Sequence, residues 1–183
     1  MNKTIQNKKT IIKQGLFASH PNQYQSIFSK KFVNLLMVDG KKTKASKLFF
    51  EMLWFLKKRI DGDSDKKSNN ISKTIIYDLS TLYYLSQALQ NVIPSVEVRK
   101  VRVAGSTYLV PAILSKKRQE SLAIKWIIDS AKKKQKNSKL KFAQCLADEI
   151  YDAFKKQGQA RQKRDELHRL AEANRAYIRY RWW

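Results

Sequence analysis

The sequence predicts a mainly α-helical protein with six helices, a protruding two-stranded β-ribbon between the third and fourth helices, and a basic N-terminal arm. Apolar residues recur at the i, i+3, i+4 and i+7 spacing of amphipathic helices along most of the chain. The spacing changes to simple alternation at about residues 95–114, which is typical of strands. We therefore expect a flexible arm over residues 1–26 and a single helical domain over residues 27–183.

The first two helices are expected on either side of a short exposed connection. The first should start near Ser29 and stop at Gly40, because glycine readily ends a helix in the left-handed conformation. Thr43 can cap the second helix, which should end near Arg59. The polar stretch 61–71 is typical of a surface loop rather than a calcium site, since no Glu occupies the twelfth position of such a loop.

The first strand of the ribbon follows a third helix, which should close at the turn before Pro94 because proline cannot continue a helix. Val96 and Val98 alternate with charged residues. The next two valines resume the alternation one residue out of phase, which predicts a β-bulge around Arg99-Lys100.

The turn of the ribbon is expected at residues 104–107. Gly105 suits the first central position of a type II′ hairpin, where φ is positive. The second strand should then return to Leu114, with Pro111 at an edge because it cannot donate to a ladder. Two strands alone are only marginally stable, so the ribbon should be steadied from outside the domain.

Three further helices are expected in the last third of the chain. Ser115 can cap the fourth, and the fifth should start at Asn137 or Ser138 and end at Gly158. Cys145 lies on the apolar face of the fifth and is expected to be a small core residue rather than a reactive thiol. In the sixth, a packed face would hold Leu167, Leu170, Ala171, Asn174 and Ile178, and a mainly cationic face Arg161, Arg164, His168, Glu172, Arg175 and Arg179.

Basic residues dominate the 183-residue chain, with 38 Lys and Arg against 15 Asp and Glu, a formal net charge of +23 and a pI near 10.1. Residues 1–60 hold 13 basic and 2 acidic side chains, and only the segment 61–91 is not basic. A peripheral membrane protein more often concentrates its charge in one helix or cluster. The distributed charge therefore favours nucleic acid as the partner, with neither a membrane nor a small-molecule substrate expected.

No pattern of residues indicates catalysis, a cofactor or a metal ion. Cys145 is the single cysteine, and His20 and His168 are too few and too scattered for a histidine-based metal site. On a helix, His168 and Asp165 are i, i+3 neighbours, which indicates a surface pair rather than an acid–base couple. We expect a protein without enzymatic activity, and an RNA-modifying enzyme is a remote alternative.

Lysine and arginine occur instead in doublets and triplets, each of which could neutralise phosphates and release counterions. These clusters are Lys41-Lys42, Lys57-Lys58-Arg59, Arg99-Lys100 with Arg102, Lys116-Lys117-Arg118, Lys132-Lys133-Lys134 and Lys163-Arg164. The 116–118 triplet falls in the first turn of a helix, where cations and free backbone amides could hold a phosphate.

Aromatic residues accompany the cations in two places. Tyr108 on the ribbon could stack on an unpaired base beside the 99–102 cations, and ordinary strand packing is the other interpretation. At the C-terminus Tyr177, Tyr180, Trp182 and Trp183 are interspersed with arginines. They could stack on bases, dock on a neighbouring protein or pack back on the domain.

Several stretches resemble the small-subunit ribosomal protein seven family, in its bacterial and organellar form. The similar stretches cover about residues 30–183 and are KFVNLLMVDGKK from Lys31, NVIPSVEVR from Asn91, VAGSTYLVP from Val103, LAIKWI from Leu122 and KRDELHRLAEAN from Lys163. The ending Arg181-Trp-Trp and the Val-Ala-Gly turn are most like mitochondrially encoded members. Bacterial members usually carry a second glycine where this chain has Ala104.

The resemblance implies a structural constituent of the small ribosomal subunit that binds the 3′ major (head) domain of the ribosomal RNA and nucleates head assembly. It implies a ribbon near the exit-site transfer RNA and the messenger path, other ribosomal proteins of the head and platform as neighbours, and a ribbon tip at Gly105 and Ser106. With the clusters above, the expected RNA-binding residues are Lys3, Lys8, Lys9, Lys41, Lys42, Arg99, Lys100, Arg102, Tyr108, Lys116, Lys117, Arg118, Arg161 and Arg164.

Lys outnumbers Arg 28 to 10, as an AT-rich genome would produce, and this favours a mitochondrial ribosome over a bacterial or plastid one. The alternative to ribosomal function is a DNA-binding architectural protein of the nucleoid type, because helices and a basic ribbon also serve that purpose.

Overall fold

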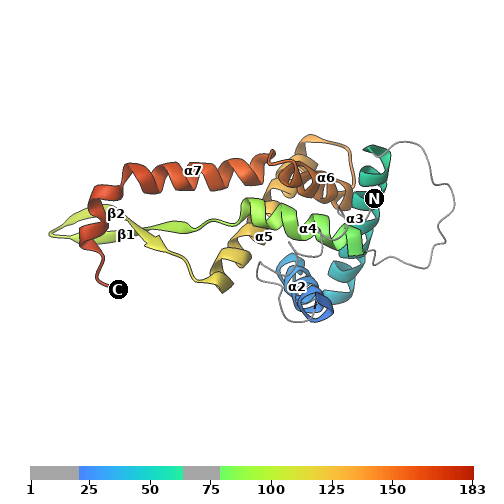
Figure 1. The fold of residues 1–183 in the computed structure, drawn as a ribbon, viewed down its shortest axis with the longest axis horizontal. Helices are drawn as coiled ribbons and strands as arrows, with labels where there is room; N and C mark the ends of the chain where they lie inside the picture. Colours follow the sequence, from blue (N-terminus) through green and yellow to red (C-terminus); the bar gives the residue numbers. More distant parts are fainter. Residues whose placement is uncertain (1–20, 64–78) are drawn as a thin grey trace, which may run out of the picture. The chain divides into compact units, whose positions relative to one another are not determined.

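The computed structural model describes residues 21–63 and 79–183, and its chain divides into two compact units, Met1–Ala45 and Ser46–Trp183. The described residues form six α-helices and a two-stranded antiparallel hairpin, which lies between the third and the fourth helix in chain order (Figure 1). The predicted fold class is confirmed. The elements are α2 (Pro21–Leu36), α3 (Lys42–Asp63), α4 (Leu79–Val92), β1 (Val96–Val103), β2 (Ser106–Ile113), α5 (Lys116–Asn137), α6 (Phe142–Phe154), α7 (Gln159–Ala173) and a 3-10 helix η1 (Arg175–Tyr180).

In the first unit, α2 begins at Pro21 rather than near Ser29. Proline is well suited to a first helical position, because its missing N–H has no partner there in any case. Residues 21–26, which were expected to belong to the arm, are therefore helical, and residues 1–20 lie outside the described residues. The predicted stop is confirmed, since Asp39 and Gly40 both have positive φ, of 53° and 70°.

The α3 helix starts at Lys42, so Thr43 lies inside it and does not cap it; the Lys41 carbonyl accepts from the Ala45 N–H. Its core-facing residues include Phe49, Met52, Leu53 and Leu56, all nearly inaccessible to solvent. The helix continues past Arg59 to Asp63 and takes in the start of the loop expected at 61–71. The remainder of that loop and the start of the predicted third helix lie outside the described residues.

Helix α6 packs against both α4 and α5 and forms the centre of the second unit. Leu85, Ile124, Ile127, Leu146 and Ile150 are fully buried there. Cys145 is buried among them with a free thiol, which confirms its prediction as a core residue. The α6 helix begins at Phe142, later than predicted, and the predicted start residues Asn137 and Ser138 are the last residue and the C-cap of α5.

The hairpin pairs Val96 with Ile113 through to Val103 with Ser106 in one continuous register, so the predicted bulge is wrong. Without a bulge, strand alternation places Val96 and Val98 on one face of β1 and Val101 and Val103 on the other. Glu97 shares the second face and is buried there at 7% exposure, although it is charged. Counting from the pair beside the turn, Pro111 falls at a position that makes no ladder hydrogen bond, where it is tolerated.

The turn consists of Ala104 and Gly105 alone, and Ser106 already belongs to β2. Both central residues have positive φ, 48° for Ala104 and 84° for Gly105. This is the pattern of a type I′ turn, so the predicted type II′ turn is wrong. Gly105 therefore occupies the second central position rather than the first.

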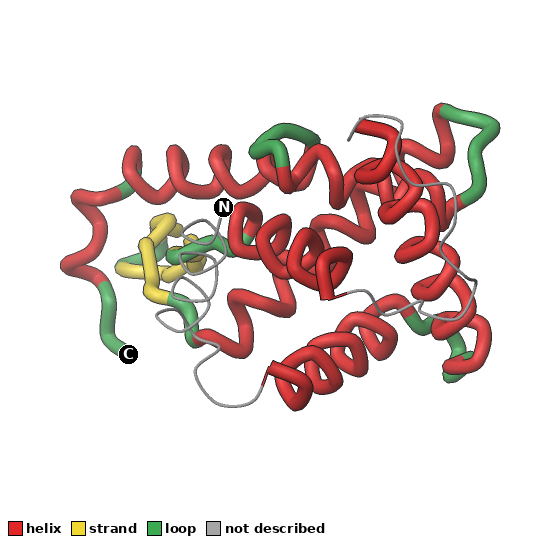
Figure 2. The backbone as a smooth tube through the Cα atoms, turned by 45° about the vertical axis from the view of Figure 1, so that its right-hand side comes forward, coloured by secondary structure: helices red, strands yellow, loops and turns green. Residues whose placement is uncertain are grey.

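Helix α7 leaves the bundle and runs beside the hairpin, and η1 lies against β2 (Figure 1). Figure 2 shows the C-terminal segment passing around the strands from this helix. The predicted packed face of the last helix is only partly confirmed, because Ala171 is buried whereas Leu170 and Ile178 are 43% and 45% exposed. None of the described helices is long and apolar enough to cross a bilayer.

Candidate nucleic-acid interface

The base of the hairpin is joined to the start of α5 by a buried carboxylate. Arg99 donates Nε–H to Oε1 of Glu97 at 2.6 Å, and Arg118 donates Nε–H to Oε2 at 2.8 Å. Burial alone would raise the pKa of Glu97, but the hydrogen bonds from Arg118 and Arg99 outweigh it and hold the pKa below its usual value. The side chains of Arg99 and Arg118 nevertheless remain 46% and 59% exposed.

The neighbouring cations of these two arginines are also exposed. Lys100 and Arg102 lie on the face of β1 opposite to Arg99, by the alternation of the strand. Lys116 and Lys117 occupy the first turn of α5, whose N-cap Ser115 makes no side-chain capping bond. The carboxylate of Glu97 thus joins one predicted ribbon cation, Arg99, to one predicted helix-start cation, Arg118.

Two arginines of α7 that were expected on an exposed cationic face are mostly covered and bind other parts of the protein. Arg161 and Arg164 each donate an Nη1–H to the carbonyl of Asn91 at 2.9 Å, and both pair with Asp165. Asn91 in turn donates its amide N–H groups to the carbonyls of Ala153 and Phe154 at the end of α6. One asparagine therefore ties α4, α6 and α7 together, and the contacts of Arg161 and Arg164 favour a structural role.

His168 does not pair with Asp165 as predicted. Its Nε2 accepts the backbone N–H of Ser95 at 3.3 Å, which holds α7 to the start of the hairpin. Burial and the neighbouring positive charge of Arg164 lower the pKa of His168 below its ordinary value. Burial would raise the pKa of Asp165, but Arg161 and Arg164 hold it low.

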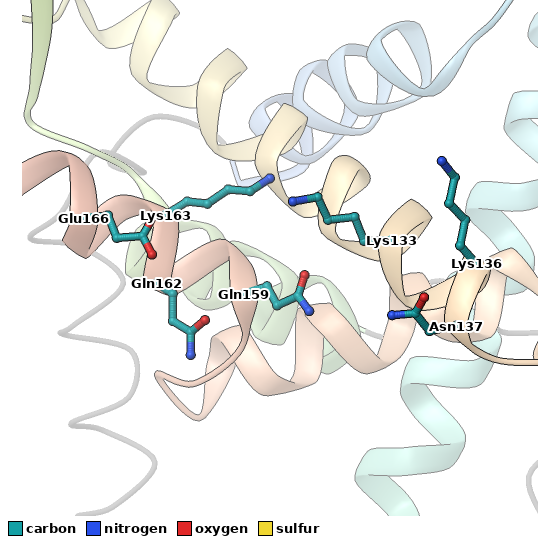
Figure 3. Close-up of a pocket in the computed structure, with 7 residues that line it drawn as sticks. All are labelled: Lys133, Lys136, Asn137, Gln159, Gln162, Lys163 and Glu166. Atoms are coloured by element: carbon teal, nitrogen blue, oxygen red, sulfur yellow. The ribbon is translucent and has the colours of Figure 1, made fainter.

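A polar groove of about 470 Å³ lies between the last turns of α5 and the first turns of α7. Lys133 and Lys163 extend their ammonium ends toward one another across it (Figure 3). Two like charges facing each other repel, so an anion between them would be stabilising. The residues that complete the lining are Lys136, Asn137, Gln159, Gln162 and Glu166. Cations beside several amides suit phosphates and sugar hydroxyls.

The lysine next to Lys133 has the opposite role. Lys134 turns inward, where its Nζ lies 2.7 Å from Oε2 of the fully buried Glu149 and 2.6 Å from Oδ2 of Asp152. Burial would lower the pKa of Lys134, but its hydrogen bonds to Asp152 and Glu149 outweigh this and raise it. Oε1 of Glu149 also accepts the N–H of Ala160 at 2.8 Å, so the carboxylate caps α7.

Gly158 makes that cap possible. Its φ is +92°, and a Cβ at this position would lie 3.0 Å from Oε1 of Glu149 and 3.1 Å from the Cβ of Asp152. A larger residue would be strained by its backbone and would crowd the carboxylate. The prediction that Gly158 ends the preceding helix is wrong, because α6 already ends at Phe154 and Lys156 takes the left-handed conformation after it, with a φ of 62°. Gly158 is instead the N-cap of α7.

The other predicted site residues are dispersed. Lys41 and Lys42 are exposed in the first unit, with Lys41 Nζ 3.5 Å from Asp39. Lys3, Lys8 and Lys9 lie outside the described residues. The ring of Tyr108 packs 5.1 Å from that of Tyr177 and 4.9 Å from that of Tyr180, which agrees with strand packing rather than with a free stacking surface.

The groove residues Lys133, Lys136 and Lys163 were absent from the predicted site. The lysine runs are visible in the sequence, but the sequence does not show that segments thirty residues apart face one another. It also does not show which member of each run turns outward.

The fold and this distribution of cations define a basic helical protein with a hairpin beside a charged surface, as in proteins that bind folded RNA. A family model described as "Ribosomal protein S7p/S5e" matches residues 2–175, and the chain therefore belongs to this ribosomal protein family. Its members are structural rather than enzymatic proteins of the small ribosomal subunit.

Named relatives agree with this membership. The chain is 48% identical to "Small ribosomal subunit protein uS7m" of Prototheca wickerhamii, covering 85% of this chain and 89% of that protein. It is 41% identical to the protein of the same name from Marchantia polymorpha, over 88% of this chain and 63% of the relative. A bacterial relative, "Small ribosomal subunit protein uS7" of Wigglesworthia glossinidia brevipalpis, is 39% identical over 96% of this chain and 99% of the relative. The uS7m relatives confirm the expected mitochondrial localisation.

Proposed function

We propose that the protein binds the 3′ major (head) domain of small-subunit ribosomal RNA and nucleates assembly of the head. In this proposal the hairpin lies near the exit-site transfer RNA and the messenger path. The neighbouring ribosomal proteins would be those of the head and platform. Membership of the ribosomal family supports the proposal.

The observation that carries the proposal is the placement of the few acids among many cations. In two of the basic clusters an acid pairs with one member, Glu97 with Arg118 and Glu149 with Lys134, while adjacent cations remain exposed. The acids thereby fix the scaffold and leave a surplus of positive charge at the surface. Such a surface is suited to the closely spaced phosphates of a folded RNA.

Footprinting of the full-length protein on small-subunit ribosomal RNA tests the proposal directly. Protection of the 3′ major domain is expected, at a salt concentration where unrelated structured RNA stays unbound. Absence of that protection contradicts the proposal. A preference for duplex DNA in a competition experiment would instead support an architectural DNA-binding protein.

The groove between α5 and α7 gives a sharper test. Replacing Lys133 and Lys163 by glutamine should weaken binding and reduce the slope of log affinity against log salt by about 0.7–0.9 for each phosphate that is no longer neutralised. Lys132→Gln is the matched control, because Lys132 is exposed but does not line the groove. Equal effects of the groove and control variants would remove the groove from the interface.

A further inference from the structure

The C-terminal tail is fixed in place by aromatic contacts with the hairpin. Tyr108 of β2 packs against Tyr177 and Tyr180 of η1, and the last two rings stack with centroids 6.2 Å apart. Such clusters stabilise beyond their apolar burial. The three rings therefore act as a clasp between β2 and η1, which returns the last residues of the chain to β1.

Beyond this clasp, the tail and β1 form a pocket of about 380 Å³. The guanidinium of Arg99 lies 5.2 Å from the ring centroid of Trp183, a cation–π contact. Because Arg99 is also held by Glu97, Trp183 is fastened to the base of the hairpin. The residues that line the pocket are Arg99, Lys100, Val101, Arg102, Trp182 and Trp183.

Trp182 is the unusual member of this group. Its side chain is 81% exposed, although its ring makes an edge contact with Trp183 at 5.6 Å and 85°. A large indole presented to solvent by a fastened tail is a flat stacking surface with little conformational freedom to lose. Lys100 and Arg102 line the same pocket, and their side chains are exposed.

The register of the hairpin leaves some backbone groups of β1 outside the ladder. Counting from the turn, Val101 and Arg99 make the ladder bonds to β2. The backbone groups of Lys100 and Arg102 consequently point away from β2. The pocket thus combines a stacking ring and cations, with no acidic side chain among its lining residues.

We propose that this pocket binds an unpaired nucleotide of single-stranded RNA, with its base stacked on Trp182 and its flanking phosphates held by Lys100 and Arg102. Stacking of bases on aromatic rings beside cations is how proteins hold single strands without reading their sequence. A duplex cannot enter in this way, because its bases are already stacked. The inference rests on the proposed function only because both require the protein to bind RNA.

The test uses the full-length protein and a short unstructured oligouridine labelled for fluorescence anisotropy. Trp182→Ala should weaken binding roughly 5- to 150-fold, the range found when one base-stacking ring is removed. Trp182→Phe should retain most of the affinity. Trp54→Ala is the matched control, because Trp54 is 55% exposed and lies beside the Lys58 ammonium, but belongs to α3. The double variant Lys100→Gln, Arg102→Gln should make the affinity for oligouridine less dependent on salt concentration.

The outcomes separate this inference from the proposed function. If the Trp182→Ala protein binds oligouridine as the unaltered protein does, or if the Trp54→Ala protein loses as much affinity, the pocket is not a nucleotide site. If the unaltered protein protects the 3′ major domain but does not bind oligouridine, the inference fails and the proposed function stands. If it binds neither RNA, both fail.

A crosslinking experiment on intact small subunits would identify which RNA supplies the unpaired nucleotide. Ultraviolet crosslinks from the peptide containing Trp182 to ribosomal RNA, or to a bound message, would both support the nucleotide site and would tell the two sources apart. Crosslinks from that peptide to protein alone would overturn it, because they would place a protein segment over the indole.

Discussion

Two networks of three charged side chains differ in which sign is in excess. One lies at the hairpin base and the other at the α6–α7 junction. At the hairpin base one acid, Glu97, holds two arginines. At the junction one cation, Lys134, holds two acids, Glu149 and Asp152. The first network has a surplus of positive charge on exposed side chains, whereas the second contains a side chain with no exposure at all. The same kind of interaction therefore presents cations to solvent in one place and uses a cation to stabilise the fold in the other.

The largest effect is expected from breaking the buried network. Lys134→Met removes the partner of Glu149, whose side chain is fully buried, and removing one member of such a pair costs about 3–5 kcal/mol. Urea unfolding measures the loss of stability. Lys133→Met, one residue away and exposed, should change the unfolding free energy by less than about 0.5 kcal/mol. Equal losses in the two variants would contradict the assignment of the inward role to Lys134.

A smaller and different effect is expected at the hairpin base. Glu97→Gln should lower the unfolding free energy by about 1–3 kcal/mol, because two charged hydrogen bonds are weakened. The salt dependence of RNA binding should not fall, since Arg99 and Arg118 keep their charges. A flatter salt dependence in Glu97→Gln would show that the carboxylate positions these arginines for RNA as well as for the fold.

Acid should act on the hairpin through His168, which accepts the Ser95 N–H. Because the folded-state pKa of His168 is lowered, the unfolded chain binds the proton more readily. Its contribution is therefore fully present above pH 6.5, the ordinary value, and is lost as pH falls through the lower folded pKa. His168→Gln should remove that part of the pH dependence and cost about 0.5–1.5 kcal/mol at a mildly alkaline pH, measured by urea unfolding. An unaltered pH profile in the variant would contradict this role.

The sequence is sufficient to predict the kinds and order of the elements, because helical and strand periodicity are local properties. It correctly places Ile124, Ile127 and Leu146 in the core and Cys145 beside them. These residues are apolar, so their position follows from burial alone.

The sequence is insufficient where a polar side chain finds a distant partner. Arg161 and Arg164 turn inward because the carbonyl of Asn91, seventy or more residues earlier, accepts their N–H groups. Glu97 is buried on the face that also holds Val101 because Arg118, at the start of α5, donates a hydrogen bond to its carboxylate. Neither contact leaves a periodic signal in the sequence. Arg161 and Arg164 therefore look like exposed surface charges, and the charged residue Glu97 makes the alternation of β1 look interrupted by a bulge. The candidate groove escapes prediction for the same reason.

The smallest effect concerns the turn, whose place is predicted correctly but whose geometry is not. Ala104 has a φ of 48°, and an alanine in the left-handed region is strained by about 1 kcal/mol. Glycine would relieve the strain but would add about 0.5 kcal/mol of conformational entropy to the unfolded chain. Ala104→Gly should therefore stabilise the protein by about 0.5 kcal/mol, measured by thermal or urea unfolding.

The same substitution sharpens the comparison between the two networks. The turn lies at the far end of the strands from Glu97, so a relaxed turn should leave the pairing of Arg99 and Arg118 with that carboxylate unchanged. Combined with Glu97→Gln, Ala104→Gly should consequently add its small gain without coupling, as expected for separate sites without shared partners. A gain that disappears in the Glu97→Gln background would show that strain at the tip is transmitted along the hairpin to its base, and that the hairpin responds as one rigid element.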